Sequence, residues 1–109
     1  MAEIFCVDEH DVAWVDYEPV PGRPNGIRVK PLTVGVDTST RVQYVEYPPD
    51  HGDSVHRHDE GEVFVVTDGE LWLDGARYGT GSILCIPRDV DYAVRSGPQG
   101  ARYFRVVVP

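Results

Sequence analysis

The sequence predicts an all-β fold, a single sandwich or barrel, and three observations support this prediction. Short runs rich in Val, Ile, Tyr and Phe recur along the chain, and Gly and Pro separate them at short intervals. No segment keeps the helical spacing of apolar residues for about ten positions. A length of 109 residues allows one hydrophobic core but not two.

Each expected strand coincides with one of the apolar runs. In chain order the strands are predicted at residues 27–32, 40–47, 62–66, 71–74, 82–86, 92–95 and 101–108. Turns are predicted where Gly, Pro and Asp cluster, at residues 47–53, 68–70, 74–81 and 96–100. We expect residues 1–27 to form an N-terminal arm or edge strands and residues 28–109 to form the barrel, with one domain overall.

The charge balance excludes several classes of partner. The chain has 18 acidic residues against 10 basic ones, a formal net charge of −8 and a pI of about 4.7. Such an acidic protein is not expected to bind nucleic acid or an anionic membrane surface. No apolar stretch approaches the roughly 20 residues of a membrane span, and the acidic N-terminal segment does not resemble a signal peptide. A cytoplasmic location is therefore expected, with Cys6 and Cys85 reduced and buried.

Three of the four histidines lie in the segment HGDSVHRHDEGEVFVV. If His56 and His58 lie on one strand, they project to the same side. A turn at 59–61 then brings Glu62 on the next strand beside them. Two imidazoles and one carboxylate form a three-ligand set for a divalent metal with open coordination positions. The alternative for each residue taken alone is a solvated surface side chain.

At this segment the sequence resembles the cupins, a family of small jelly-roll β-barrels. Its first motif, G-x5-H-x-H-x3or4-E-x6-G, matches His56, His58, Glu62 and Gly69 in register, with Asp50 at the leading glycine position and Gly52 two residues later. Gly81 and Pro87 begin the second motif. The resemblance covers residues from about 28 to 107, and it implies a single-domain cupin-type jelly-roll barrel.

The second motif then departs from the family pattern. Tyr92 stands where the family has its last metal-binding histidine, Asp89 replaces a glycine and Ser96 replaces an asparagine. The resemblance therefore implies a metal held by His56, His58 and Glu62, with the Tyr92 phenol at the fourth position. This set is similar in composition to the two-histidine, one-carboxylate site of non-haem iron enzymes. We expect Fe(II), with Zn, Mn or Ni as alternatives.

Three function classes follow from this interpretation. The favoured one is a metal-dependent enzyme of the oxygenase, lyase or isomerase type, acting on a small organic molecule inside the barrel. The alternatives are a non-catalytic ligand- or metal-sensing module and a cupin whose metal site is degenerate. Tyr92 and Glu62 are the candidate catalytic residues. Tyr92 has three possible roles, as metal ligand, as proton donor or acceptor, or as packing, and we favour proton transfer.

The surrounding residues leave some alternatives open. Either Arg41 and Gln43 or their neighbours on the same strand face inward, and an inward arginine would select a carboxylate. His51 is expected at the rim of the site. Several aromatic residues are candidates for either the pocket or the core: Tyr44, Tyr47, Trp72, Tyr78, Tyr103 and Phe104. The apolar N-terminal segment and the exposed sheet edges of a small barrel predict a homodimer.

Overall fold

The computed structural model describes residues 4–36 and 38–109. It contains one short 3-10 helix, η1 (Glu9–Asp11), and seven strands. The strands are β1 (Val15–Asp16), β2 (Arg28–Pro31), β3 (Arg41–Tyr47), β4 (Gly61–Leu73), β5 (Ala76–Gly79), β6 (Ile83–Ile86) and β7 (Val94–Val108). The prediction of an all-β fold is therefore confirmed. Within the described residues, no helix is long and apolar enough to cross a membrane.

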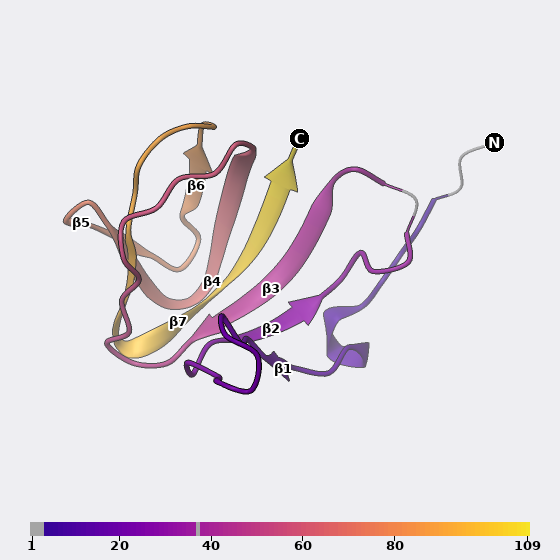
Figure 1. The fold of residues 1–109 in the computed structure, drawn as a ribbon, viewed down its shortest axis with the longest axis horizontal. Helices are drawn as coiled ribbons and strands as arrows, with labels where there is room; N and C mark the ends of the chain where they lie inside the picture. The colour runs from indigo at the N-terminus through magenta and orange to yellow at the C-terminus, as the bar shows by residue number, and fades with distance from the viewer. Residues whose placement is uncertain (1–3, 37) are drawn as a thin grey trace.

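All seven strands belong to one antiparallel sheet with the order β1-β2-β3-β7-β4-β5, and β6 pairs with β4. Figure 1 shows β3, β7 and β4 side by side through the middle of the molecule, with the sheet curving toward β5 and β6. Because β7 lies between β3 and β4, its inward side chains face the same interior as theirs. This interior contains the core and the candidate site.

Two strands are longer than the sequence predicts. The expected turns at 68–70 and 96–100 lie inside β4 and β7, and both strands continue through them. The pairing between the two strands shifts register next to Asp68 and Leu71, which marks a bulge. Gly69 sits there with a φ of 66°, and a Cβ at this position would collide with the backbone of Gly100. The glycine and proline signals thus mark a bend within a strand pair. β5, in contrast, forms inside the segment predicted as the 74–81 turn.

The core consists of the alternate residues of these strands. Phe64, Val66 and Leu71 of β4 and Val107 of β7 are fully buried, and Tyr103 of β7 is 3% exposed. Period-two alternation places Phe64 and Val66 on one face, and the register shifts that follow return Leu71 to the same face. Other buried residues of the same cluster are Ile27, Val45, Tyr47, Leu73, Leu84, Ile86, Tyr92, Val94 and Ala101.

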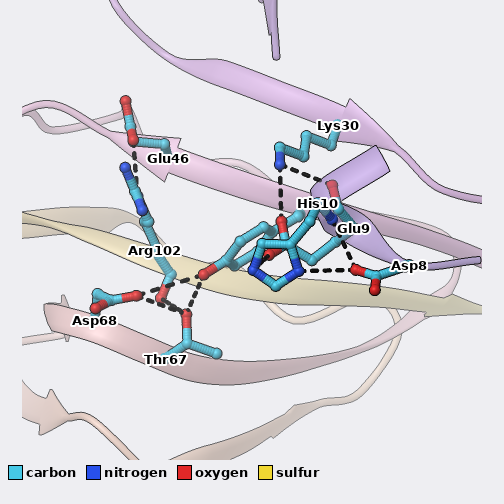
Figure 2. Close-up of polar contacts among 9 residues, drawn as sticks. Asp8, Glu9, His10, Lys30, Glu46, Thr67, Asp68 and Arg102 are labelled. Atoms are coloured by element: carbon cyan, nitrogen blue, oxygen red, sulfur yellow. Dashed lines mark hydrogen bonds and ion pairs between the residues drawn. The ribbon is translucent and has the colours of Figure 1, made fainter. Parts of the chain in front are cut away.

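The described part of the N-terminal arm is attached to the outer face of the sheet (Figure 2). The buried Lys30 ammonium donates to the backbone carbonyl of Glu9 and to its carboxylate, each at 2.8 Å. Lys30 also lies 4.9 Å from the ring centre of Trp14, and Trp14 lies against Tyr44. A cation held by a carboxylate and an aromatic face fixes the arm at this point.

Both cysteines are free thiols, and the expectation that they are buried is wrong. Cys85 lies on β6 between Leu84 and Ile86, which point inward, so its own side chain points outward. Cys6 precedes η1 in the arm, and its side chain is exposed.

Candidate functional site

The curved sheet encloses a cavity of about 440 Å³ that opens to solvent. Its apolar wall comes from β2, β3, β4, β7 and the residue before β2, and includes Ile27, Val29, Val45, Phe64 and Val94. Its polar side chains include His56, His58, Tyr92, Arg105, Gln43, Tyr47, Tyr103 and Asp53. A concave, mostly apolar volume with a few converging polar groups is typical of small-molecule sites.

Glu62 is the most buried carboxylate of this region, with its side chain only 1% exposed. It lies on β4, next to β6 through Ile86 and next to β7 through Val107. A buried carboxylate is tolerated only when its charge is compensated and its oxygens accept hydrogen bonds. Each oxygen of Glu62 accepts a hydrogen bond, and the two donors belong to different residues.

Arg105 supplies the compensating charge. Its Nε donates to Glu62 Oε2 in a short ion pair, and its Nη1 donates to Gln43 Oε1 at 3.0 Å. Arg105 lies opposite Gln43 on β3 and opposite Phe64 on β4, so the guanidinium is held between two neighbouring strands. The cation inside the barrel is therefore Arg105. Arg41 instead pairs with Glu60 at the surface.

Tyr92 donates its phenolic proton to the other oxygen, Glu62 Oε1. Burial raises the pKa of Tyr92 above its usual value, and the hydrogen bond to Glu62 and the nearby Glu62 charge raise it further. The phenol is therefore protonated at neutral pH. The sequence places Tyr92 at the position of the family's last metal-binding histidine, and here it contacts Glu62; its part in catalysis stays a prediction.

His56 and His58 line the same cavity, although not from a continuous strand. His56 forms an isolated bridge with Tyr92, and His58 belongs to a loop. The expectation of one strand carrying both histidines is therefore wrong, while both side chains still face the interior. Their rings lie 5.0 Å apart between centroids, and His58 Nε2 is 3.7 Å from Glu62 Oε1.

The hydrogen bond of His56 fixes its tautomer. Its Nδ1 lies 2.9 Å from the backbone carbonyl oxygen of Ser54, which can only accept. Nδ1 must therefore carry the proton, and Nε2 of the neutral ring has a free lone pair. Metal-ligating histidines are commonly held in this way.

The metal site expected at His56, His58 and Glu62 stays a prediction. Among residues 4–36 and 38–109, no three His, Cys, Asp or Glu side chains lie close enough together to hold an ion. Glu62 is engaged by Tyr92 and Arg105 on its two oxygens. The guanidinium thus neutralises the carboxylate at the position where a metal would otherwise do so.

The other residues discussed from the sequence separate into inner and outer sets. Tyr47 and Tyr103 line the cavity, whereas Tyr44 and Phe104 stack on the outer face with centroids 4.4 Å apart. Tyr78 packs against the core, and the Trp72 indole donates to Glu70. His51 lies at the edge of the site, with Nε2 3.7 Å from Asp53 Oδ1.

Sequence reasoning missed Arg105 and Asp53 as site residues. A signal for Arg105 exists, because residues 101, 103, 105 and 107 share one face of β7 and the other three are Ala, Tyr and Val. A single charge on an otherwise buried face indicates a paired interior group. Asp53 lies in a loop and carries no such pattern.

The curved antiparallel sheet, its enclosed cavity and the in-register first motif define a cupin jelly-roll barrel. The chain belongs to the family described as the ChrR cupin-like domain, whose model matches residues 2–106. A search of curated proteins finds no match.

Solved structures share the fold at low identity. A chain of the Rhodobacter sphaeroides complex of SigE with the anti-sigma ChrR is 16% identical with a TM-score of 0.72, covering 91% of this chain and 50% of that one. An RmlC-like cupin from Ralstonia eutropha is 15% identical, with a TM-score of 0.83 and coverage of 97% and 69%. A protein described as a putative acetylacetone dioxygenase from Methylibium petroleiphilum is 15% identical, with a TM-score of 0.81 and coverage of 99% and 78%. This chain thus spans half the length of the first of these relatives.

Proposed function

We propose that this chain binds a small organic molecule in the barrel cavity and exchanges a proton with it through Tyr92 and Glu62. The observation that carries the proposal is the arrangement around Glu62. A protonated phenol and two imidazoles line one cavity of about 440 Å³, and the phenol donates to the buried carboxylate of Glu62. That volume lies within the range of about 300–1,000 Å³ that small-molecule pockets occupy.

The residues divide the work in a simple way. The Tyr92 oxygen accepts a proton from the bound molecule while its own phenolic proton passes along the shared hydrogen bond to Glu62, and the reverse transfer returns a proton to the molecule. Arg105 compensates the charge of the buried Glu62 carboxylate. His58, whose Nε2 faces Glu62 Oε1, is a second group able to exchange a proton.

Binding is tested first: acetophenone serves as an uncharged aromatic probe, and changes in the amide NMR shifts of the protein report its binding. We expect the shifted resonances to cluster at His58, Phe64 and Tyr92, because these residues line the cavity. Resonances of the β4–β5 turn around Asp74 serve as the internal control. Shifts confined to the outer face would contradict the proposal.

A metal-dependent enzyme is the second candidate, favoured by the free Nε2 lone pair of His56. Here His56, His58 and Glu62 would hold the ion, with Fe(II) the first choice and Zn, Mn or Ni the alternatives. The ion would act as a Lewis acid when bound. Glu62 would have to be shared with Arg105 or released from it.

Titration calorimetry with Zn(II), and with Fe(II) under anaerobic conditions, separates the two candidates. If the site works without a metal, we expect no stoichiometric binding of either ion, and His56→Ala should leave the calorimetric signal unchanged. Stoichiometric metal binding that is lost in His56→Ala would contradict the metal-independent site and support the metal-dependent enzyme. Arg57→Ala is the matched control, because Arg57 lies between the two histidines and pairs with Asp91 at the surface.

A sensing module is the third possibility, and the family match is what favours it. Such a module would bind the molecule without converting it and would pass the signal to a protein partner. Incubation of bound compounds followed by mass spectrometry distinguishes this case from an enzyme. Stable binding with no chemical change supports the module.

A further inference from the structure

The cavity has a second polar end that the Glu62 cluster does not use. Asp53 and Tyr47 form it, with Tyr103 beside them, and all three line the cavity. Building on the proposed function, we infer that this end binds a hydrogen-bond donor of the ligand, such as a hydroxyl, and that the cavity selects uncharged ring compounds over carboxylates.

Both groups are held in place by the fold. Tyr47 is the last residue of β3 and pairs with Ala101 of β7. Asp53 lies in the loop after β3, where its backbone N–H donates to the carbonyl of Val94 at 2.9 Å. The neighbouring Gly52 forms a bridge with Arg95. A site built on strand ends and a bridged loop is positioned without help from a ligand.

The proton arrangement makes this end an acceptor. The Tyr47 hydroxyl donates its proton to Asp53 Oδ2. Burial, followed by the neighbouring Tyr103 and Asp53, raises the pKa of Tyr47 well above its usual value, so this proton stays on the phenol. The groups left for a ligand are Asp53 Oδ1 and the lone pairs of the Tyr47 oxygen. Because both only accept, a ligand group that bonds to Asp53 or Tyr47 must donate.

The opposite end of the cavity lies far enough from Asp53 for a ring to fit between the two ends. Gln43 and Arg105 lie there, and Gln43 precedes Tyr47 by four residues on β3. At about 3.3 Å per residue, their Cα atoms are separated by roughly 13 Å. Tyr103 and Phe64 line the cavity between the two ends. An aromatic ring stacked on these side chains can therefore carry its donor toward Asp53.

The charges oppose an anionic ligand. Arg105 is already paired with Glu62. Within the described residues, the only ion pair of Asp53 is with His51, whose Nε2 lies 3.7 Å away and is charged only when protonated. With His51 neutral, the formal charge of Asp53, Glu62 and Arg105 together is −1. A carboxylate entering the cavity would meet this net negative charge in a partly desolvated space.

The test compares three probes of similar shape by calorimetry: 4-hydroxyacetophenone, acetophenone and 4-hydroxybenzoate. We expect 4-hydroxyacetophenone to bind about tenfold more tightly than acetophenone, which is the usual effect of a hydrogen bond to a charged acceptor. We expect 4-hydroxybenzoate to bind most weakly. In Asp53→Asn the preference for the hydroxyl should fall to about twofold, since the acceptor loses its charge.

Two further variants keep the test decisive. Tyr47→Phe removes the hydroxyl of this side chain but retains Asp53, so the preference for the ligand that carries a hydroxyl should persist. Asp74→Asn, on the exposed β4–β5 turn, should leave all three affinities unchanged. Equal affinity of the two ketones for the unaltered protein would overturn the inference while leaving the proposed function standing. Tightest binding of 4-hydroxybenzoate would also overturn it, and the absence of binding by every probe would remove both.

Discussion

Two of the three arginines of strand β7, Arg102 and Arg105, each pair with a glutamate, and the two pairs lie on opposite faces of the sheet. Arg102 Nε donates to Glu46 Oε2 at 2.8 Å on the outer face, where the two side chains are 44% and 20% exposed (Figure 2). Arg105 donates to Glu62 on the inner face, where the exposures are 21% and 1%. Both pairs join an arginine to a glutamate, and they differ in their exposure to solvent.

The comparison teaches how burial changes the meaning of an ion pair. Water solvates the partners of the outer pair when they separate, so that pair contributes little to stability. Glu46 also keeps a second partner, Arg28. The inner carboxylate has no access to bulk water, so the loss of its partner leaves an uncompensated charge in the barrel. The inner pair is therefore costly to break, and it lies where the cavity needs a fixed carboxylate.

Replacing Arg105 has the largest expected effect. Arg105→Met should lower the free energy of unfolding by about 3–5 kcal/mol, because Glu62 is then buried without a cation. Arg102→Met should lower it by less than about 1 kcal/mol, as expected for an exposed pair. Urea denaturation at pH 7 measures both variants. Equal losses would remove the distinction between the two faces.

A double variant identifies the cause of that loss. If an unpaired charge is responsible, replacing Glu62 as well, in Arg105→Met/Glu62→Leu, should recover most of the stability, because an apolar pair needs no compensation. If the double variant is no more stable than Arg105→Met alone, the loss arises from packing of the arginine stem instead.

Removal of single tyrosine hydroxyls tests the same difference between the inner and outer faces, with smaller expected effects. Tyr92→Phe deletes a hydrogen bond to the buried Glu62 carboxylate and should reduce stability by about 1.5–3 kcal/mol. Tyr44→Phe deletes the outer-face bond to Thr67 Oγ1, 2.7 Å long, and should reduce stability by about 0.5–1.5 kcal/mol. Thermal unfolding of both variants tests this order, and the reverse order would contradict it.

The smallest effect concerns pH on the outer face. Although partial burial opposes the shift, hydrogen bonds from Arg28 and Arg102 lower the pKa of Glu46 below its usual value. A lowered folded-state pKa gives stability that is present above the unfolded pKa of about 4.3 and is lost as the pH falls through the folded value. Glu46→Gln should therefore be destabilising by at most about 1 kcal/mol at pH 7.

At pH 3 the difference between Glu46→Gln and the unaltered protein should be smaller, as measured by urea denaturation at both pH values. A larger difference at pH 3 than at pH 7 would contradict the lowered pKa of Glu46.

The sequence predicted the architecture well where local pattern decides it. The alternation in β3 and the apolar run of β4 correctly indicate strands, and the first motif correctly places Glu62 among the interior residues. The long strands β4 and β7 were divided in two, because bulge glycines and turn glycines look alike without knowledge of the pairing partner.

The site was predicted only in part, for a related reason. His56, His58, Glu62 and Tyr92 are close in space, and a family motif identifies their positions. Arg105 enters the site through its pairing with Gln43 and Glu62, which are distant in sequence. Asp53 enters through a loop fixed by Val94. Long-range pairing determines both positions, and no local spacing encodes it.

The central place of β7 also has a consequence for the order of folding. β3 and β4 do not pair with each other along the described sheet, since β7 lies between them. β7 is the last strand in chain order, so both earlier strands have unpaired backbone edges until it arrives. Pairing such as that of Arg41 with Val107 closes a long loop of chain, which makes this step slow. We therefore expect the insertion of β7 between β3 and β4 to limit the rate of folding, and the cavity, which β7 helps to line, to form together with that step.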